Sequence, residues 1–130
     1  MIHGIGIDII EIKRIKKTKE RFGNIFLTKV FTESEIRYCQ THPKTEDQHF
    51  AGRFAAKEAV LKAFGLRWPF ISLKDIEIIP DVITGAPEVI LYGNILGKAN
   101  RLKISSILLS ISHTKEYAIA QAICNVGDKL

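Results

Sequence analysis

The 130-residue sequence predicts an α+β domain in which an antiparallel sheet packs against a long central helix. Two observations lead to this fold class. Residues 45–64 keep helical spacing over almost their whole length, and the second half of the chain contains several short apolar segments bounded by turn residues. One pair of those segments is separated by only four residues, a connection that joins antiparallel strands. We therefore expect a single domain over residues 1–130.

The first element is a strand over residues 2–10, in which two kinds of side chain alternate. One face carries Ile5, Ile7 and Ile9, and the other carries Gly4, Gly6 and Asp8. Two glycines on one face indicate close approach by a ligand or by another backbone segment. We expect the Asp8 face to be open, and a glycine-weakened edge strand is the alternative.

A basic helix follows, in which Ile12, Ile15 and Phe22 keep helical spacing up to Gly23. Six of the nineteen basic residues of the chain lie in this segment: Lys13, Arg14, Lys16, Lys17, Lys19 and Arg21. The net charge of +5 predicts an anionic partner, which charge alone leaves open between nucleic acid, phosphorylated metabolites and acidic proteins.

Two capping boxes mark the next helices. Thr32 with Glu35 begins a short helix that ends before Pro43, and Thr45 with Gln48 begins the long helix, which ends at Phe64 and Gly65. The apolar face of the long helix places Glu58 near its centre, with Lys62 one turn further on. A buried Glu58–Lys62 ion pair and a ligand-binding carboxylate are both compatible with this spacing.

The second half of the chain reads as strands over residues 76–79, 89–92, 107–112 and 117–126. A helix with Ile95, Leu96, Ala99 and Leu102 on one face separates the second strand from the third. Gly85, Ala86 and Pro87 form the turn between the first two strands, because glycine permits a positive φ and proline fixes its own.

Targeting signals and cysteine spacing point to the cytoplasm. No apolar run approaches the roughly 20 residues that span a bilayer, and Asp8 interrupts the apolar N-terminal segment, which lacks the features of a signal peptide. Cys39 and Cys124 have neither disulfide-framework nor zinc-site spacing, so we expect reduced thiols.

Asp8 and Glu58 each place one carboxylate in an otherwise apolar element. An ionised carboxylate removed from water must be paired, neutralised or bound to a metal. Mg²⁺ takes one or two protein carboxylates, with water and substrate phosphates completing its shell. Lys62 can neutralise a phosphate oxygen, and Ser112, His113 and Thr114 offer further donors, so these residues are compatible with a pyrophosphate site.

Four segments in their order and spacing resemble holo-acyl-carrier-protein synthase, the short bacterial type of 4′-phosphopantetheinyl transferase. They are Gly4–Ile12, Arg53–Ala59, Gly85–Pro87 and Ser110–Thr114. The resemblance covers nearly the whole chain. It implies a 4′-phosphopantetheinyl transferase-like fold, a homotrimer with active sites between subunits, and a role in fatty acid and lipid biosynthesis. The implied reaction is Mg²⁺-dependent transfer of 4′-phosphopantetheine from coenzyme A to a serine of apo acyl carrier protein, which releases adenosine 3′,5′-bisphosphate.

The resemblance also implies roles for individual residues. Asp8 and Glu58 match the metal carboxylates, and Glu58, Lys62 and His113 are the catalytic candidates. A metal-bound water, or Glu58 acting through a water, would be the base for the serine hydroxyl, and His113 is a better candidate for holding coenzyme A. The candidates for contacting coenzyme A are Arg53, Phe54, Lys62, Gly85, Pro87, Ser112, His113 and Thr114.

The same resemblance implies that the basic helix binds the acyl carrier protein, because acyl carrier proteins are acidic. Lys13, Arg14, Lys17 and Arg21 are the expected contacts, with Arg14 and Arg21 foremost; a merely solvated charged face is the alternative.

Two other functions for the protein remain as alternatives. A nucleic-acid-binding module would explain the charge but not Asp8 and Glu58, and residues 13–21 contain no aromatic side chain for base stacking. A metal-dependent phosphohydrolase would pass the phosphoryl group to water instead of serine. We expect no nucleic-acid or membrane partner.

Overall fold

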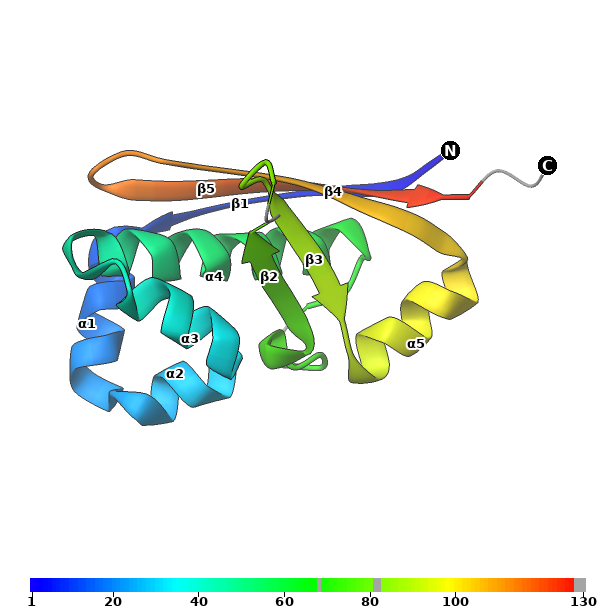
Figure 1. Ribbon diagram of the computed structural model, residues 1–130. Coiled ribbons are helices and arrows are strands. Elements are labelled where there is room, and N and C mark those ends of the chain that lie inside the picture. Colours follow the sequence, from blue (N-terminus) through cyan, green and yellow to red (C-terminus); the bar gives the residue numbers. More distant parts are fainter. Residues whose placement is uncertain (68, 81–82, 128–130) are drawn as a thin grey trace.

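The computed structural model of the protein describes residues 1–67, 69–80 and 83–127. Its strands are β1 (Ile2–Glu11), β2 (Ile76–Pro80), β3 (Pro87–Leu91), β4 (Ile104–His113) and β5 (Tyr117–Val126). Its α-helices are α1 (Ile12–Phe22), α2 (Asn24–Val30), α3 (Glu33–Gln40), α4 (Glu46–Ala63) and α5 (Gly93–Leu102), and two 3₁₀ turns cover Pro43–Thr45 and Leu73–Asp75 (Figure 1).

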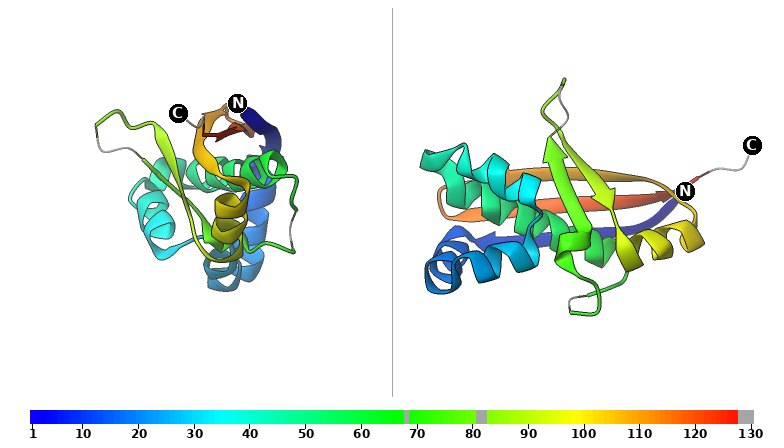
Figure 2. Two further views of the ribbon diagram at one scale, coloured as in Figure 1. Left: turned by 90° about the vertical axis from the view of Figure 1, so that its right-hand side faces the viewer. Right: turned by 60° about the horizontal axis from the view of Figure 1, so that its bottom comes forward.

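The strands form two antiparallel sheets, one with the order β1-β5-β4 and one that pairs β2 with β3. The three-stranded sheet lies over one side of α4, while α1, α2, α3 and the smaller sheet lie on its other sides (Figures 1 and 2). The predicted α+β class, antiparallel pairing and central helix are confirmed. Within the described part of the chain, no helix combines the length and the apolar character needed to cross a membrane.

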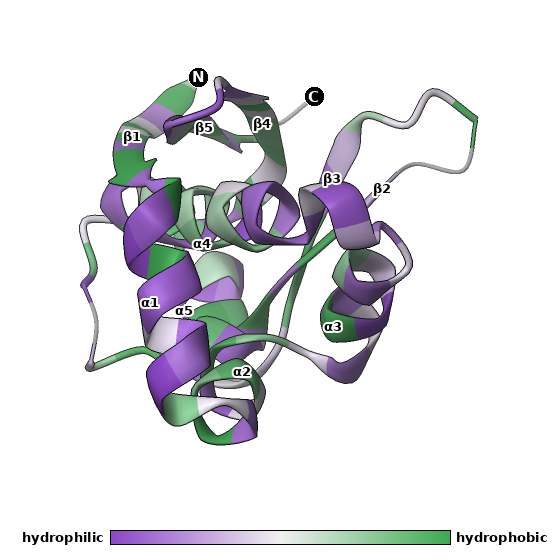
Figure 3. Ribbon diagram, turned by 90° about the vertical axis from the view of Figure 1, so that its left-hand side faces the viewer, coloured by the Kyte–Doolittle hydropathy of each residue, from purple (hydrophilic) through white to green (hydrophobic). Residues whose placement is uncertain are grey.

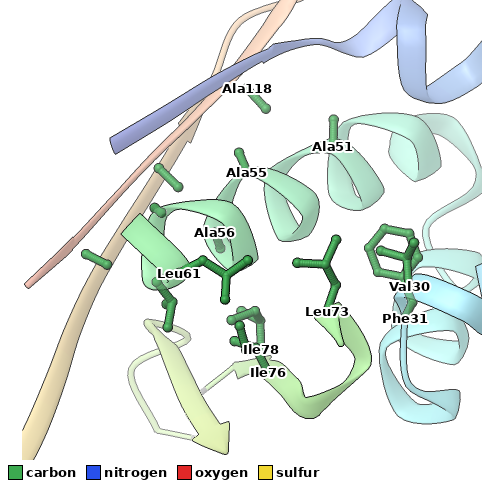
Figure 4. Packing of buried hydrophobic residues seen from close by; sticks show 14 of the residues in the cluster. Val30, Phe31, Ala51, Ala55, Ala56, Leu61, Leu73, Ile76, Ile78 and Ala118 are labelled. Carbon is green, nitrogen blue, oxygen red and sulfur yellow. The ribbon is translucent and has the colours of Figure 1, made fainter. Parts of the chain in front are cut away.

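Small side chains bring the large sheet close to α4. Ala118, Ala120 and Ala122 of β5 are buried, as are Ala55 and Ala59 of the helix. The opposite side of the helix packs against larger side chains, among them Phe31, Leu73, Ile76 and Ile78 (Figure 4). The helix is therefore buried around most of its circumference. Because its residues are mainly apolar or small on every side, periodicity could not indicate which stripe remains accessible.

Two glycines let β1 lie directly on the helix. A Cβ atom added to Gly4 or Gly6 would overlap the carbonyl oxygen of Ala63 or Ala59, respectively. The close approach is thus that of the α4 backbone, and the expectation of an open glycine face is wrong. The face that carries Ile5, Ile7 and Ile9 lies on the outside, and these side chains are 55–61% exposed.

We expect Gly6→Ala to destabilise the fold by several kcal/mol, because overpacking typically costs about 1–3 kcal/mol and here the new methyl group meets rigid helix backbone. Urea unfolding followed by circular dichroism measures the loss. Gly97→Ala in α5 is the matched control and should stabilise the protein by roughly 0.5–1 kcal/mol, the helix preference of alanine over glycine. An unchanged unfolding midpoint for Gly6→Ala would contradict this packing.

The predicted start of α3 is confirmed, but that of α4 is wrong in one respect. The Thr32 amide donates to Glu35 Oε1 at 2.8 Å and the Glu35 amide donates to Thr32 Oγ1 at 3.3 Å, which completes a capping box. Thr45 makes no side-chain cap, because the 3₁₀ turn Pro43–Thr45 leads directly into the helix. Gly65 follows the helix with a φ of 72°, as expected.

A buried ion pair, unforeseen from the sequence, joins α3, α4 and β2. Lys57 Nζ donates to Glu35 Oε1 at 2.7 Å and to the carbonyl oxygens of Leu73 at 2.9 Å and Ile76 at 2.7 Å. The other carboxylate oxygen, Glu35 Oε2, accepts from the Ile78 amide at 2.8 Å. All three ammonium protons are used, so this fully buried lysine is satisfied without water.

Candidate active site

Asp8 of β1 and Glu58 of α4 meet at one flank of the central helix. They line the same pocket, which has a volume of about 310 Å³ and also includes Arg14, Thr18 and Phe54. Gly4 and Gly6 make this meeting possible, because they allow β1 to approach α4 closely just before Asp8. The structure thus brings together the two carboxylates that the sequence singles out as metal ligands.

Burial opposes the ionisation of both carboxylates, and the charge of Asp8 also opposes that of Glu58. Burial raises the pKa of Asp8, and the hydrogen bond and positive charge of Lys62 oppose that rise. Burial also raises the pKa of Glu58, the nearby negative charge of Asp8 raises it further, and Lys62 opposes both. A cation between the two groups would relieve this repulsion. Two carboxylates in an accessible pocket are the donor set that Mg²⁺ takes from proteins, so these residues fit the ion.

Lys62 pairs with Asp8 and not with Glu58. Its Nζ lies 3.2 Å from Asp8 Oδ1 and donates to the Ile7 carbonyl oxygen at 2.9 Å, and its side chain is 52% exposed. Among the described residues, none forms a hydrogen bond or ion pair with the Glu58 carboxylate. The alternative of a buried Glu58–Lys62 pair is therefore wrong, and an exposed Asp8–Lys62 pair takes its place.

Glu58 does not lie at the centre of a buried face, contrary to expectation. Phe54 and Glu58 are half-buried and Lys62 is exposed, so positions four residues apart form the accessible stripe of α4. The sheet and the smaller elements cover the other sides of the helix. Among the described elements, none covers this stripe completely, so its candidate site residues stay accessible.

An apolar pocket adjoins the carboxylates. It has a volume of about 430 Å³ and shares Thr18, Phe26, Phe54 and Glu58 with the pocket described above. Its remaining lining comes from α1, α2 and the segment before β2: Phe22, Ile25, Lys29, Val30 and Leu73. The helix α2 was not anticipated from the sequence. Phe54, predicted to contact coenzyme A, lies where the two pockets meet.

A second group of predicted residues lies elsewhere. Arg53, Gly85 and Pro87 line a pocket of about 180 Å³ together with Tyr38, His49 and Ile111. Burial, and then the charges of Arg53, His42 and His113 at the end of β4, lower the pKa of His49. Thr114 has a structural task in the turn, because its Oγ1 accepts from the amides of Glu116 and Tyr117 at 3.2 and 3.1 Å.

The two groups lie on opposite flanks of α4. In the large sheet, Asp8 and Ile111 are both paired with Ala120 of the middle strand, so β1 and β4 lie to either side of it. Figure 3 shows β1 and α1 on one side of α4, and β4, β3 and α3 on the other. The structure therefore unites Asp8, Glu58 and Lys62, but it separates them from Arg53, Gly85, Pro87 and His113.

Comparisons with known proteins agree with this arrangement. The model of the family described as the 4′-phosphopantetheinyl transferase superfamily matches residues 4–122. The chain belongs to this superfamily. Curated relatives named holo-[acyl-carrier-protein] synthase include one from Clostridium tetani, 49% identical over 125 residues and 95% of each chain. Another, from Natranaerobius thermophilus, is 46% identical over 95% of this chain and 97% of its own length.

Solved structures support the same assignment. A holo-ACP-synthase from Plasmodium yoelii has a TM-score of 0.85 and 36% identity, over 98% of each chain. One from Bacillus anthracis, solved in complex with CoA (3′,5′-ADP), has a TM-score of 0.80 and 36% identity, over 98% of this chain and 99% of its own. The resemblance to holo-acyl-carrier-protein synthase is confirmed, and with it the prediction of an enzyme of the transferase class.

The basic helix of this superfamily member borders the pocket of Asp8 and Glu58. Lys13, Arg14, Lys17 and Arg21 are exposed on α1, and Arg14 also lines the pocket. Lys19 behaves differently, because its Nζ pairs with Asp47 at 2.6 Å and Glu46 at 3.2 Å at the start of α4. A partner that binds the exposed cations would thus lie beside the two carboxylates.

Proposed function

We propose that this transferase moves 4′-phosphopantetheine from coenzyme A to a serine of apo acyl carrier protein and releases adenosine 3′,5′-bisphosphate. The observation that carries this proposal is the shared pocket of Asp8 and Glu58 at the edge of a basic helix. The names of the curated relatives and the coenzyme A complexes of two solved neighbours support the substrates. We propose that the reaction serves lipid synthesis in the cytoplasm.

Asp8 and Glu58 are the residues that would hold Mg²⁺. Bound there, the ion would neutralise charge on the pyrophosphate of coenzyme A and favour the departure of the adenosine bisphosphate. Burial and the negative charge of Asp8 raise the pKa of Glu58, and this cost of ionisation supports a cation site at this position.

The residues of the pocket suit the remaining steps. The serine hydroxyl attacks the phosphorus that carries pantetheine, its proton leaves, and the bond from that phosphorus to the bridging oxygen breaks. Glu58, whose pKa is raised by burial and by Asp8, is a suitable acceptor for the proton, directly or through a water. Lys62 has a half-exposed side chain that can move from Asp8 to a phosphate oxygen.

The division of the site between two flanks supports the proposed homotrimer. One coenzyme A molecule contacts both Glu58 and Arg53 most simply when the two residues come from neighbouring copies. The outer face of the large sheet supplies an apolar surface for such contacts, with Ile5, Ile7, Ile9, Leu108 and Ile119 exposed. Contiguous apolar surface of this kind is uncommon on monomeric proteins and marks interaction sites. We propose that active sites form between subunits, with His113 helping to hold coenzyme A.

We expect Arg14→Glu to weaken recognition of the acidic carrier protein. The variant should lower kcat/KM for the carrier protein about tenfold or more at low salt and should flatten its salt dependence, because like charges now face each other. Steady-state kinetics at several salt concentrations measures both effects. Arg101→Glu, which makes the same charge change on the distant helix α5, should behave like the parent protein; equal kinetics for Arg14→Glu would remove α1 from the docking surface.

Intact-mass analysis of apo acyl carrier protein tests the whole proposal. Incubation with coenzyme A and Mg²⁺ should add one phosphopantetheine to the carrier protein, and a chelator should prevent the addition. Free 4′-phosphopantetheine with no gain in protein mass would indicate a phosphohydrolase. Absence of both products, beside a working synthase, would overturn the proposal.

A further inference from the structure

In the free protein, a cation of the chain itself lies against Asp8. Lys62 Nζ is 3.2 Å from Asp8 Oδ1 and donates to the Ile7 carbonyl oxygen at 2.9 Å, so the ammonium group bridges two oxygens from neighbouring residues of β1. The Asp8 side chain is only 18% exposed, which partly shields its end of the pair from water. The ammonium group therefore occupies one of the two carboxylates to which the proposed function assigns Mg²⁺.

Glu58 lacks such a partner. Among the residues that the structure describes, none donates a hydrogen bond to its carboxylate, although the group lines the same pocket as Asp8. Burial and the negative charge of Asp8 raise the pKa of Glu58, and the opposing charge of Lys62 is the smallest of these three effects. Lys62 thus compensates one carboxylate of the pocket and leaves the other for an external cation.

The ammonium group and a metal ion compete for Asp8. A divalent cation held by the two carboxylates repels a neighbouring ammonium group, and this repulsion is strong in a partly buried pocket, where screening by water and salt is weak. The attraction given up when Lys62 leaves Asp8 is modest, because a half-exposed ion pair contributes little in water. Release of Lys62 is therefore the favourable response to metal binding.

Lys62 is free to leave Asp8. Its side chain is 52% exposed, and it lies on the accessible stripe of α4 one turn beyond Glu58. A lysine carries its charge on a flexible four-carbon stem, so the ammonium group can swing away from Asp8 without a movement of the helix. The pyrophosphate of coenzyme A, which the proposed function places in this pocket, offers the released group charged acceptor oxygens.

We propose that Lys62 is an internal counter-cation that Mg²⁺ displaces from Asp8, and that this displacement makes the ammonium group available to the pyrophosphate of coenzyme A. The assignment rests on the proposed function, because it takes Mg²⁺ and coenzyme A as the ligands of the pocket. The exchange moves a charge but no proton, and it breaks no covalent bond. Metal and coenzyme A consequently bind cooperatively, since each favours the released state of Lys62.

The sign of the effect on Mg²⁺ binding distinguishes this role from a positioning role. A lysine that held Asp8 ready for the metal would weaken Mg²⁺ binding when it is removed. A counter-cation that has to leave gives the opposite sign, because its removal ends the competition for Asp8. The same removal should weaken coenzyme A binding in the presence of the metal, since the phosphates lose one cation.

Isothermal titration calorimetry of the assembled protein tests the exchange in two steps. Mg²⁺ is titrated first without coenzyme A, and Lys62→Met should bind the ion about fivefold more tightly than the parent protein, the upper end of what an exposed ion pair contributes. Coenzyme A is then titrated without carrier protein, once with saturating Mg²⁺ and once with a chelator. By reciprocity, Mg²⁺ should raise the coenzyme A affinity about fivefold more in the parent protein than in Lys62→Met.

Two further variants make the result specific. Lys16→Met makes the same substitution at an exposed position of α1 that lines neither pocket of this flank, and it should leave both affinities within about twofold. Lys62→Gln removes the charge but keeps a polar side chain and should repeat the Lys62→Met result, and thermal unfolding verifies that each variant is folded. Unchanged or weaker Mg²⁺ binding in both Lys62 variants would overturn the exchange, as would an equal effect of Mg²⁺ on coenzyme A affinity in these variants and the parent protein.

The outcomes also separate the exchange from the proposed function. Tighter Mg²⁺ binding by the Lys62 variants, with no mass gain on the carrier protein when the parent protein is used, would retain the counter-cation and refute the transferase reaction. A normal mass gain with the parent protein, beside Lys62 variants that bind Mg²⁺ as the parent does, would retain the reaction and refute the exchange.

Discussion

Replacing Glu58 by Gln is expected to reduce phosphopantetheine transfer by about a thousandfold or more, since the change removes a metal ligand and a candidate base together. Asp8→Ala should have a comparable effect, because it removes the other carboxylate of the pocket. Intact-mass kinetics with a saturating carrier protein measures the loss. Turnover near that of the parent protein in either variant would refute the metal role of the residue concerned.

Although Glu58→Gln should lose activity, it should not lose stability. Burial and Asp8 raise the pKa of Glu58 above its unfolded value, so the ionised group disfavours the folded state at pH values above that raised pKa. The cost disappears as the pH falls through the raised pKa, and a neutral amide avoids it altogether. Without metal at pH 8, the variant should therefore be at least as stable as the parent protein.

Thermal unfolding with and without Mg²⁺ completes this test. The ion should raise the unfolding temperature of the parent protein, because it binds only the folded pocket, and should have little effect on Glu58→Gln. Glu33→Gln is the matched control, since Glu33 is an exposed carboxylate at the start of α3. A large loss of stability in Glu58→Gln would show that Glu58 is structural.

Lys57→Met is expected to destabilise the fold by about 3–5 kcal/mol, the cost of leaving one partner of a buried ion pair unpaired. The ammonium group supplies three hydrogen bonds, and its loss removes one donor each from Glu35 and from the carbonyl oxygens of Leu73 and Ile76, and leaves the buried carboxylate without its counter-charge. Denaturant unfolding measures the change. Lys16→Met, which makes the same substitution on the exposed face of α1, should change stability by less than about 0.5 kcal/mol.

A double-variant cycle assigns the loss to the pair. Adding Glu35→Gln to Lys57→Met removes the unpaired charge but keeps an oxygen for the Thr32 or Ile78 amide. The double variant should therefore be more stable than the sum of the single effects predicts. Strict additivity, or a loss below about 1 kcal/mol for Lys57→Met, would contradict the importance of the pair.

Several residues of the candidate site could be predicted from the sequence. Asp8 and Glu58 were site candidates because a lone carboxylate in an apolar element needs a partner. The structure places both in one pocket. Arg53, Gly85 and Pro87, which the resemblance assigned to coenzyme A, line one pocket. Tyr38 and His49 line the same pocket but were not predicted, since a ring on one helix and an imidazole on another give no local signal of their meeting.

The buried Lys57–Glu35 pair shows a different limit. Both residues have helix-compatible types, and Glu35 already has a role as the capping residue of α3. Sequence reasoning places such charges at the surface, because burial is costly unless donor and acceptor meet. Whether they meet depends on how α3, α4 and β2 pack, which involves segments far apart in the chain.

By itself, the sequence determined the helices and strands that alternation, capping residues and turn residues specify, the antiparallel pairing, and the two candidate carboxylates, Asp8 and Glu58. These properties depend on neighbours within a few residues. Only the tertiary structure decided that the glycine face of β1 lies against α4, that Phe54, Glu58 and Lys62 form the accessible stripe, and that the predicted site divides between two flanks. The physical reason is that α4 is apolar or small on nearly all sides, so contacts with distant elements, not its own periodicity, decide which side chains stay accessible.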